Sequence, residues 1–183
     1  MHVLVTGASG MLGRVLMPAL LGAGHKVRAL SRRQQASAHG ETWAVADIDS
    51  PGETLTAAVD GVDGIVHCAS NSPTAEATDV AGTCHLLDAA SEAGVAHLLY
   101  VSIVGIDVIA TPYYEAKLAA ERIVALLDAG PGGRTRDLAG PEVLSGAQMA
   151  HALVENFGGE AHLGGEVLDV GAVTFAQAVA RVP

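Results

Sequence analysis

The sequence predicts an α/β fold: a doubly wound parallel sheet, covered by helices on both faces and completed by a small C-terminal cap. Its first two-thirds alternates short apolar runs with helix-like patterns, which is typical of right-handed βαβ units. Glycine-containing segments at residues 22–24 and 93–94 separate a predicted helix from the next strand. Hydrophobic residues make up 50% of the chain and aromatic residues only 3%, so aliphatic side chains must build the core of this sheet.

The individual elements follow from the period of the apolar residues. Strands are expected at residues 2–6, 25–30, 42–47, 64–68 and 97–102. Helices are expected at residues 11–23, 53–59, 78–93 and 113–127. These elements form one domain over residues 1–128. Because the carboxyl ends of parallel strands meet at one edge of a sheet, a ligand is expected at that edge.

Residues 129–183 are expected to form a short C-terminal cap packed on the same domain. Residues 128–135 are rich in glycine and are the most linker-like part of the chain. A strand at residues 135–139 and helices at residues 147–157 and 175–181 are expected beyond them. Capping-box patterns, Ser145-x-x-Gln148 and Thr174-x-x-Gln177, support the two helices.

Charge and composition narrow the range of partners. A formal net charge of -10 disfavours nonspecific binding to nucleic acid or to anionic membranes. No apolar stretch approaches the roughly 20 residues that span a bilayer, and no signal-peptide pattern is seen. Cys68 and Cys84 lack C-x-x-C spacing and are expected to stay reduced in the cytoplasm. The eight histidines lack metal-ligand spacing, so no metal site is expected.

A glycine-rich turn follows the first strand and opens into the first helix. Its glycines have the spacing G-x-x-G-x-x-G, which brings backbone N–H groups and a helix N-terminus against a pyrophosphate. The first glycine would allow the tight turn, the second the approach to phosphate, and the third close helix packing. The expected binding residues are Gly7, Ser9, Gly10, Met11, Leu12 and Gly13. A glycine-rich turn without a ligand is the alternative.

The end of the second strand bears on which dinucleotide would bind. Proteins that bind NAD usually carry an acid there, which accepts from the ribose 2′-OH. This strand instead runs into Arg32 and Arg33, and no acid appears before Glu41. A guanidinium suits a 2′-phosphate, so NADP(H) is expected rather than NAD(H); a solvated basic turn is the alternative. Further cofactor contacts are expected from Asp47, Ile48, Ala69 and Ser70.

The end of the fifth strand and the helix that follows it carry three residues that suggest proton-transfer chemistry. Ser102 ends the strand, and Tyr113 and Lys117 share one face of the next helix. A lysine ammonium one turn away favours the phenolate form of a tyrosine, which could then exchange a proton with a carbonyl or alcohol oxygen. Lys117 could also hold the nicotinamide ribose, and Ser102 could stabilise the substrate oxygen. A Y-x-x-x-K pair alone is common. This pair suggests catalysis because it lies after the fifth predicted strand.

Together these segments resemble the short-chain dehydrogenase/reductase superfamily, in its atypical or extended branch of epimerase-like and NmrA-like proteins. The resemblance covers about residues 1–125 and implies a Rossmann fold, a nicotinamide cofactor and the roles given above for Ser102, Tyr113 and Lys117. The matching pieces are the glycine loop, Asp47-Ile48, the strand end at residues 65–70, Asp79-Val-Ala-Gly82-Thr83, residues 97–102 and Tyr113-Tyr-Glu-Ala-Lys117.

Two departures from that family pattern bear on function. Asp79 stands where many relatives have Asn, which in them helps to organise the active-site water and lysine. The chain also reads as shortened after the Tyr/Lys helix, where relatives continue with a further strand and a substrate loop. An uncovered sheet edge of that kind would favour a homodimer.

Three hypotheses follow. The first is an NADP(H)-dependent oxidoreductase acting on a small carbonyl or alcohol substrate. The second is a noncatalytic NAD(P)(H)-binding sensor or regulator of the NmrA-like type. The third is a shortened, inactive relative.

Overall fold

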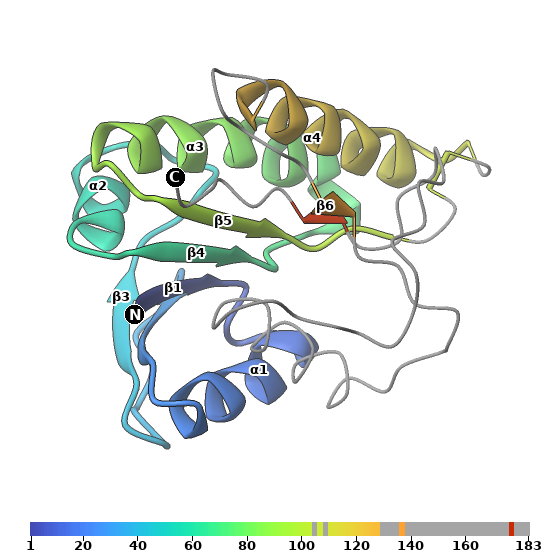
Figure 1. The fold of residues 1–183 in the computed structure, drawn as a ribbon. Helices are drawn as coiled ribbons and strands as arrows, with labels where there is room; N and C mark the ends of the chain where they lie inside the picture. Colours follow the sequence, from blue (N-terminus) through green and yellow to red (C-terminus); the bar gives the residue numbers. More distant parts are fainter. Residues whose placement is uncertain (104–105, 108–109, 129–135, 138–175, 178–183) are drawn as a thin grey trace.

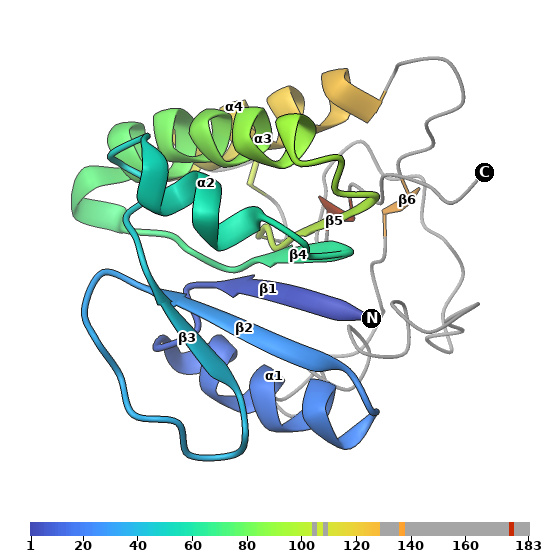
Figure 2. The same cartoon turned by 90° about the vertical axis from the view of Figure 1, so that its left-hand side faces the viewer.

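A five-stranded parallel sheet forms the centre of the protein, as predicted. The computed structural model describes residues 1–103, 106–107, 110–128, 136–137 and 176–177. The strands are β1 (His2–Thr6), β2 (Lys26–Ser31), β3 (Thr42–Val45), β4 (Gly64–His67) and β5 (His97–Tyr100). They lie in the order β3-β2-β1-β4-β5 (Figure 2). From β1 the chain first adds β2 and β3 on one side, and it then crosses over to add β4 and β5 on the other side. A topological switch point therefore lies between β1 and β4.

Helices cover both faces of this sheet. The helix α1 (Met11–Gly22) lies on one face, and α2 (Glu53–Val59), α3 (Gly82–Glu92) and α4 (Pro112–Asp128) lie on the other (Figure 1). A short 3-10 turn, η1 (Ser72–Thr74), and a π-helical segment, η2 (Glu76–Ala81), lead directly into α3. Among the described residues, no helix is long and apolar enough to cross a membrane.

Alternation along the strands divides the apolar core into two layers. In β1, Val3 and Val5 pack on the α1 side, whereas Leu4 packs on the side of the other three helices. Side chains from α1 fill the first layer, and side chains from α2, α3 and α4 fill the second. Aliphatic residues dominate both layers; Tyr100 is fully buried in the second layer, and the partly buried Trp43 packs against the first.

The helix stops lie where the glycines predicted them. Gly24 and Gly94 have φ angles of 85° and 69°, a left-handed conformation that glycine adopts without strain. The next residues close each turn back on the helix: His25 N–H donates to Leu20 O, and Val95 N–H donates to Ala90 O.

Two predicted elements differ from the structure. The helix expected at residues 78–93 begins earlier, with the π-helical turns of η2, and becomes α-helical only at Gly82. The helix expected at residues 175–181 is contradicted at Ala176–Gln177 (β7), which pair antiparallel with Arg136–Asp137 (β6). A capping-box pattern describes only a local preference, and backbone pairing replaces it there. Arg136–Asp137 (β6) fall within the strand expected at residues 135–139, whereas the helix expected at residues 147–157 lies outside the described residues.

A directed chain of hydrogen bonds runs through the buried ends of the central strands. The Thr83 hydroxyl donates to Asp79 O at 2.6 Å, so its oxygen must accept from His67 Nε2 at 2.9 Å. A neutral His67 then accepts from the Thr6 hydroxyl through Nδ1, at 2.6 Å, and Thr6 Oγ1 accepts from Ala69 N–H. Burial, assisted by the charge on Lys117, lowers the pKa of His67 to about 3.

Gly13 offers a stability test with a control in the same helix. A Cβ at Gly13 would lie 2.5 Å from Ala8 Cα and from Gly7 O, whereas a Cβ at Gly22 would meet nothing within 4 Å. Gly13→Ala is expected to force α1 from β1 and to lower the free energy of unfolding by about 1–3 kcal/mol. Gly22→Ala should be neutral or stabilise by up to about 1 kcal/mol. Urea unfolding measures both, and equal effects would contradict the close packing.

The neutral His67 predicts a dependence of stability on pH. Its native pKa of about 3 lies below the ordinary value of 6.5, so the unfolded chain binds a proton that the native protein does not. This part of the stability is complete above pH 6.5 and is lost, at about 1.4 kcal/mol per pH unit, as the pH falls toward 3. His67→Gln should flatten the slope of unfolding free energy against pH, and the exposed His39→Gln should not. Identical slopes for wild type and His67→Gln would refute the assignment.

Candidate functional site

A pocket of about 250 Å³ opens at the carboxyl ends of the strands, over the switch point between β1 and β4. It contains most of the predicted cofactor residues, drawn from the loops after four different strands. Its lining consists of Gly7, Ser9, Gly10, Leu30, Ser31, Arg32, Asp47, Ile48, Asp49, Cys68, Ala69, Ser70, Asn71 and Thr78. This is the position at which open α/β sheets bind ligands. Clusters of three or more metal-ligating side chains are absent from the described residues.

The backbone of the glycine loop passes against the loop after β4. Gly7 has a φ angle of 64°, and a Cβ there would lie 2.7 Å from Cys68 C and from Ala69 N. A side chain at this position is therefore excluded both by backbone conformation and by space. Gly10 N–H donates to Gly7 O at 2.9 Å and closes the turn before α1 begins. The first glycine thus makes the tight turn that its spacing predicted.

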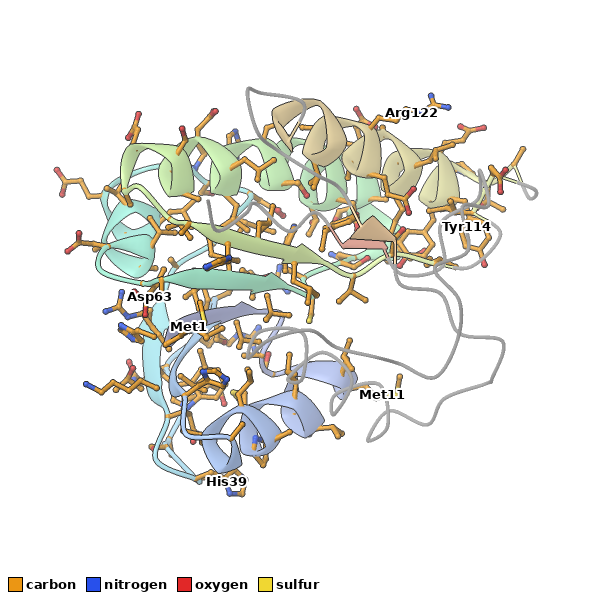
Figure 3. All side chains as sticks on the ribbon, in the orientation of Figure 1. Met1, Met11, His39, Asp63, Tyr114 and Arg122 are labelled. Carbon is orange, nitrogen blue, oxygen red and sulfur yellow. The ribbon has the colours of Figure 1, made fainter. Side chains whose placement is uncertain are left out.

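The N-terminus of α1 fits an anion. Gly10 occupies the N-cap position without a side-chain hydrogen bond to the helix, and the first turn carries no acidic residue. The amides of Met11, Leu12 and Gly13 come before Arg14 N–H, the first amide that donates one turn back (to Gly10 O), so helix geometry gives them no partner within α1. Unsatisfied N–H groups and the positive end of the helix dipole suit a pyrophosphate. Met11, Leu12 and Gly13 themselves are not among the lining residues of the pocket, and Met11 is 90% exposed (Figure 3).

The two arginines after β2 differ in their relation to the pocket. Arg32 lines it, whereas Arg33 is exposed and is not among the lining residues. The backbone N–H of Arg33 donates to Ser31 Oγ at 3.3 Å, which fixes the start of this turn. The structure thus brings one of the two predicted basic residues to the pocket.

Glu41, the first acid after β2, is committed to its own loop. Its carboxylate accepts from the backbone N–H groups of Ala38 and His39, each at 2.9 Å, and from Trp43 Nε1 at 3.0 Å. Burial alone would raise the pKa of Glu41, but these hydrogen bonds outweigh it and lower the pKa to about 2. Glu41 is also absent from the pocket lining.

Two carboxylates after β3, those of Asp47 and Asp49, line the pocket. Asp47 Oδ1 accepts from Asp49 N–H at 3.1 Å, and Asp49 Oδ2 accepts from the Thr78 hydroxyl at 3.0 Å. Ile48 lies between them and is buried. The sequence indicated Asp47 and Ile48, whereas Asp49 and Thr78 were missed, because their meeting depends on a contact 29 residues apart.

The other missed lining residues are Leu30, Ser31, Cys68 and Asn71. Ser31, Cys68 and Asn71 each adjoin a predicted site residue, and Leu30 directly precedes Ser31 at the end of β2, so the ends of the strands carried a signal that could have found them. Burial raises the pKa of Cys68 to about 12, against a smaller opposing effect of Lys117, so the thiol stays protonated.

Tyr113, at the start of α4, reaches the edge of the pocket. Its hydroxyl oxygen lies 2.9 Å from Ser70 Oγ, a lining residue of the loop after β4. Either hydroxyl can donate in this bond. Tyr114, its neighbour, packs its ring 5.8 Å from the ring of Tyr113 (centroid to centroid) and lies at the same end of the molecule as Met11 (Figure 3).

Ser102 and Lys117 occupy buried positions behind this edge. Within the described part of the chain, Ser102 Oγ has no hydrogen-bond partner. Lys117 Nζ lies 3.4 Å from Asp79 Oδ1 and 4.5 Å from the centroid of the Tyr100 ring. Burial lowers the pKa of Lys117, and the neighbouring Asp79 carboxylate opposes that shift. The structure therefore brings Tyr113 to Ser70, and Lys117 to Asp79.

Comparisons with known proteins identify the family of the chain. A model of the NAD(P)H-binding family matches residues 7–128. A 3 beta-hydroxysteroid dehydrogenase/Delta 5-->4-isomerase of Mycobacterium tuberculosis is 36% identical over 115 residues, covering 55% of this chain and 31% of the relative. The photosystem II assembly factor Ycf39 of Cyanophora paradoxa is 32% identical over 111 residues, covering 56% of this chain and 34% of the relative.

Solved structures share the fold and include nucleotide complexes. A short-chain dehydrogenase/reductase superfamily protein from Agrobacterium tumefaciens with bound NAD is 28% identical, with a TM-score of 0.63 over 71% of this chain and 46% of that one. The NADPH-dependent quinone oxidoreductase QOR2 of Escherichia coli, complexed with NADPH, is 25% identical, with a TM-score of 0.58 over 67% and 44%. The chain spans less than half of these proteins, and only 12% of one uncharacterised relative from Mycobacterium tuberculosis.

The matched segment runs from the first glycine of the loop to the end of α4 and so contains the pocket, Tyr113 and Lys117. The chain therefore belongs to the NAD(P)H-binding family, as a Rossmann-fold member of the short-chain dehydrogenase/reductase superfamily.

Proposed function

We propose that this chain is an NADP(H)-dependent oxidoreductase that transfers hydride between the cofactor and a small carbonyl or alcohol substrate. The observation that carries the proposal is the 2.9 Å contact between Tyr113 and Ser70, because it puts a phenolic hydroxyl at the edge of a glycine-lined pocket. Several relatives are oxidoreductases by name, which supports the reaction class.

Different residues of the pocket would bind different parts of a dinucleotide. The first-turn amides of α1 would hold the pyrophosphate, as their lack of a cap allows. Arg32 would meet a ribose 2′-phosphate, which a guanidinium recognises with paired hydrogen bonds. Asp47 and Ile48 would face the adenine, and Ala69 and Ser70 would border the ribose and pyrophosphate.

When bound, the nicotinamide supplies or accepts the hydride at the substrate carbon. Tyr113 gives its hydroxyl proton to the carbonyl oxygen during reduction and takes a proton from the alcohol in reverse. The hydrogen bond with Ser70 orients that hydroxyl. Ser102 Oγ, which has no partner among the described residues, is free to donate to the substrate oxygen.

A noncatalytic sensor or regulator is the second candidate, and one observation favours it. Ser102 and Tyr113 share no hydrogen bond in the described residues. Ycf39 is named as an assembly factor, so similarity over this region extends to proteins named for roles other than catalysis. Binding of NADPH without turnover of any compound in a broad carbonyl panel would support this candidate.

Cofactor preference is the first test. Calorimetric titration should show tighter binding of NADPH than of NADH. Arg32→Ala should weaken NADPH binding about tenfold or more and leave NADH binding nearly unchanged, because a charge-assisted contact to the 2′-phosphate is lost. Arg33→Ala should have a smaller effect. Arg122→Ala is the matched control, since Arg122 lies on the outer side of α4 (Figure 3). Equal affinity of the wild type for both cofactors would contradict the proposed preference for NADPH.

Tyr113→Phe tests the proton transfer. It is expected to lower turnover by about 10²–10⁴-fold, the usual contribution of general acid catalysis, while NADPH affinity is retained. Tyr114→Phe is the control, because Tyr114 neighbours Tyr113 but has the wrong offset from Lys117. The assay is the loss of NADPH absorbance with a panel of small aldehydes and ketones. Full turnover by Tyr113→Phe would rule out the mechanism.

A further inference from the structure

The turn after β3 forms one wall of the pocket, at the edge of the sheet. In the order β3-β2-β1-β4-β5, β3 is an edge strand that pairs with β2 alone. Asp47, Ile48 and Asp49 of this turn all line the pocket. Because a turn that follows an edge strand has a neighbouring strand on one side only, contacts from outside the sheet must hold this wall in place.

Three residues on one face of η2 and α3 supply such contacts. Thr78, Gly82 and His85 are spaced by four and then three residues, which places them on the same side of the helix. The Thr78 hydroxyl donates to Asp49 Oδ2 at 3.0 Å. His85 Nδ1 lies 2.8 Å from the carbonyl oxygen of Ile48. Gly82 comes between these two hydrogen bonds in the chain and packs directly against the turn.

The bond from His85 determines where its ring carries a hydrogen. A carbonyl oxygen can only accept, so Nδ1 of the half-buried His85 must be the donor to Ile48. His67 has the opposite arrangement, because its Nε2 donates to Thr83 and its Nδ1 accepts from Thr6. In their neutral forms the two histidines therefore carry the hydrogen on different ring nitrogens.

Gly82 provides the space in which the Ile48 side chain lies. A Cβ at Gly82 would be 2.9 Å from Cγ1 and 3.1 Å from Cδ1 of Ile48, and 3.1 Å from Asp49 Oδ1. Ile48 is 4% exposed and yet lines the pocket, so its side chain lies between the helix and the ligand space. Because Gly82 has no side chain, Ile48 can lie back against α3 and leave that space open.

We propose that Gly82 and His85 are positioning residues for the adenine of the bound dinucleotide: His85 fixes the backbone of Ile48, and Gly82 lets the Ile48 side chain withdraw from the pocket. This inference rests on the proposed function, in which Asp47 and Ile48 face the adenine. A flat base needs a space of fixed width, and either a loose turn or a displaced Ile48 would change that width.

Gly82→Ala tests the space behind Ile48. The atoms nearest to the new methyl group belong to side chains rather than to backbone, so the variant is expected to fold with Ile48 turned toward the pocket. Its affinity for adenosine 2′,5′-bisphosphate, measured by calorimetric titration, should fall about tenfold. Its affinity for reduced nicotinamide mononucleotide, which has no adenine, should not change. Gly22→Ala, whose Cβ would meet nothing within 4 Å, is the matched control.

A second substitution separates this effect from general damage to the helix. Ile48→Val removes Cδ1, one of the two Ile48 atoms nearest to the new Cβ. In the Gly82→Ala background it should recover affinity, because the shorter side chain extends less far into the pocket. Unchanged affinity in folded Gly82→Ala would overturn the role of Gly82. A double variant that binds no better than Gly82→Ala would overturn it as well.

The ring of His85 provides a test in the wild-type protein. Histidine side chains are neutral at about pH 9, where long-range ¹H–¹⁵N spectra distinguish a hydrogen on Nδ1 from one on Nε2. His85 should carry its hydrogen on Nδ1, and His67, as an internal control, should carry it on Nε2. A hydrogen on Nε2 of His85, or exchange between the two forms, would refute the bond to Ile48.

Two substitutions then connect that bond to the ligand. His85→Leu removes the donor and should weaken the binding of adenosine 2′,5′-bisphosphate about three- to tenfold. His85→Asn keeps an N–H donor close to the position of Nδ1 and should bind nearly as well as the wild type. Equal losses in the two variants would mean that the ring only fills space, and would reject its positioning role.

The same titrations separate this inference from the proposed function. A wild-type protein that binds neither NADPH nor adenosine 2′,5′-bisphosphate would refute the proposed function, and with it any adenine to be positioned. A wild type that binds both, together with Gly82→Ala and His85→Leu variants that bind equally well, would refute the positioning roles alone.

Discussion

The close approach of two backbones at the switch point is the constraint on which the site depends. Gly7 leaves β1 with a positive φ angle and passes against Cys68 and Ala69, where no Cβ fits. Gly13 allows α1 to begin against the same turn. Because these contacts leave no room for side chains, they hold the N-terminus of α1, the end of β1 and the loop after β4 around one pocket. Binding groups from distant parts of the chain are positioned by backbone, which moves less than side chains do.

Buried hydrogen bonds between polar groups stabilise the same junction. Thr6, His67 and Thr83 form a hydrogen-bond chain with one direction, and its last acceptor is the backbone of Asp79. Satisfied polar groups of this kind rigidify a core, whereas an unpaired one would be costly. The Asp79 side chain then continues the connection to Lys117 and Asn71. One buried network therefore joins the ends of β1 and β4 to η2, α3 and α4.

The sequence predicted the strands, their parallel arrangement and the four principal helices because apolar period and glycine stops are local signals. It identified eight of the pocket-lining residues, since strand ends in such a sheet must converge. It did not predict the contact of Tyr113 with Ser70 or that of Lys117 with Asp79. These pairs lie 43 and 38 residues apart, and their distances depend on how α4 and η2 pack. The π-helical start of the third helix was missed for the same reason: its buried partners, and no local pattern, favour the wider turn.

The charges around the pocket determine which groups can attract an anionic ligand. The chain carries a net charge of -10, and Asp47 and Asp49 line the pocket, yet the proposed ligand is an anion. Lys117 is held in the interior by Asp79, so it contributes no free ammonium to the phosphates. Attraction must then come from the uncapped amides and dipole of α1 and from Arg32 at the rim. Amides bind a phosphate only at short range and in a fixed geometry, which makes binding here depend on the same glycine contacts that shape the turn.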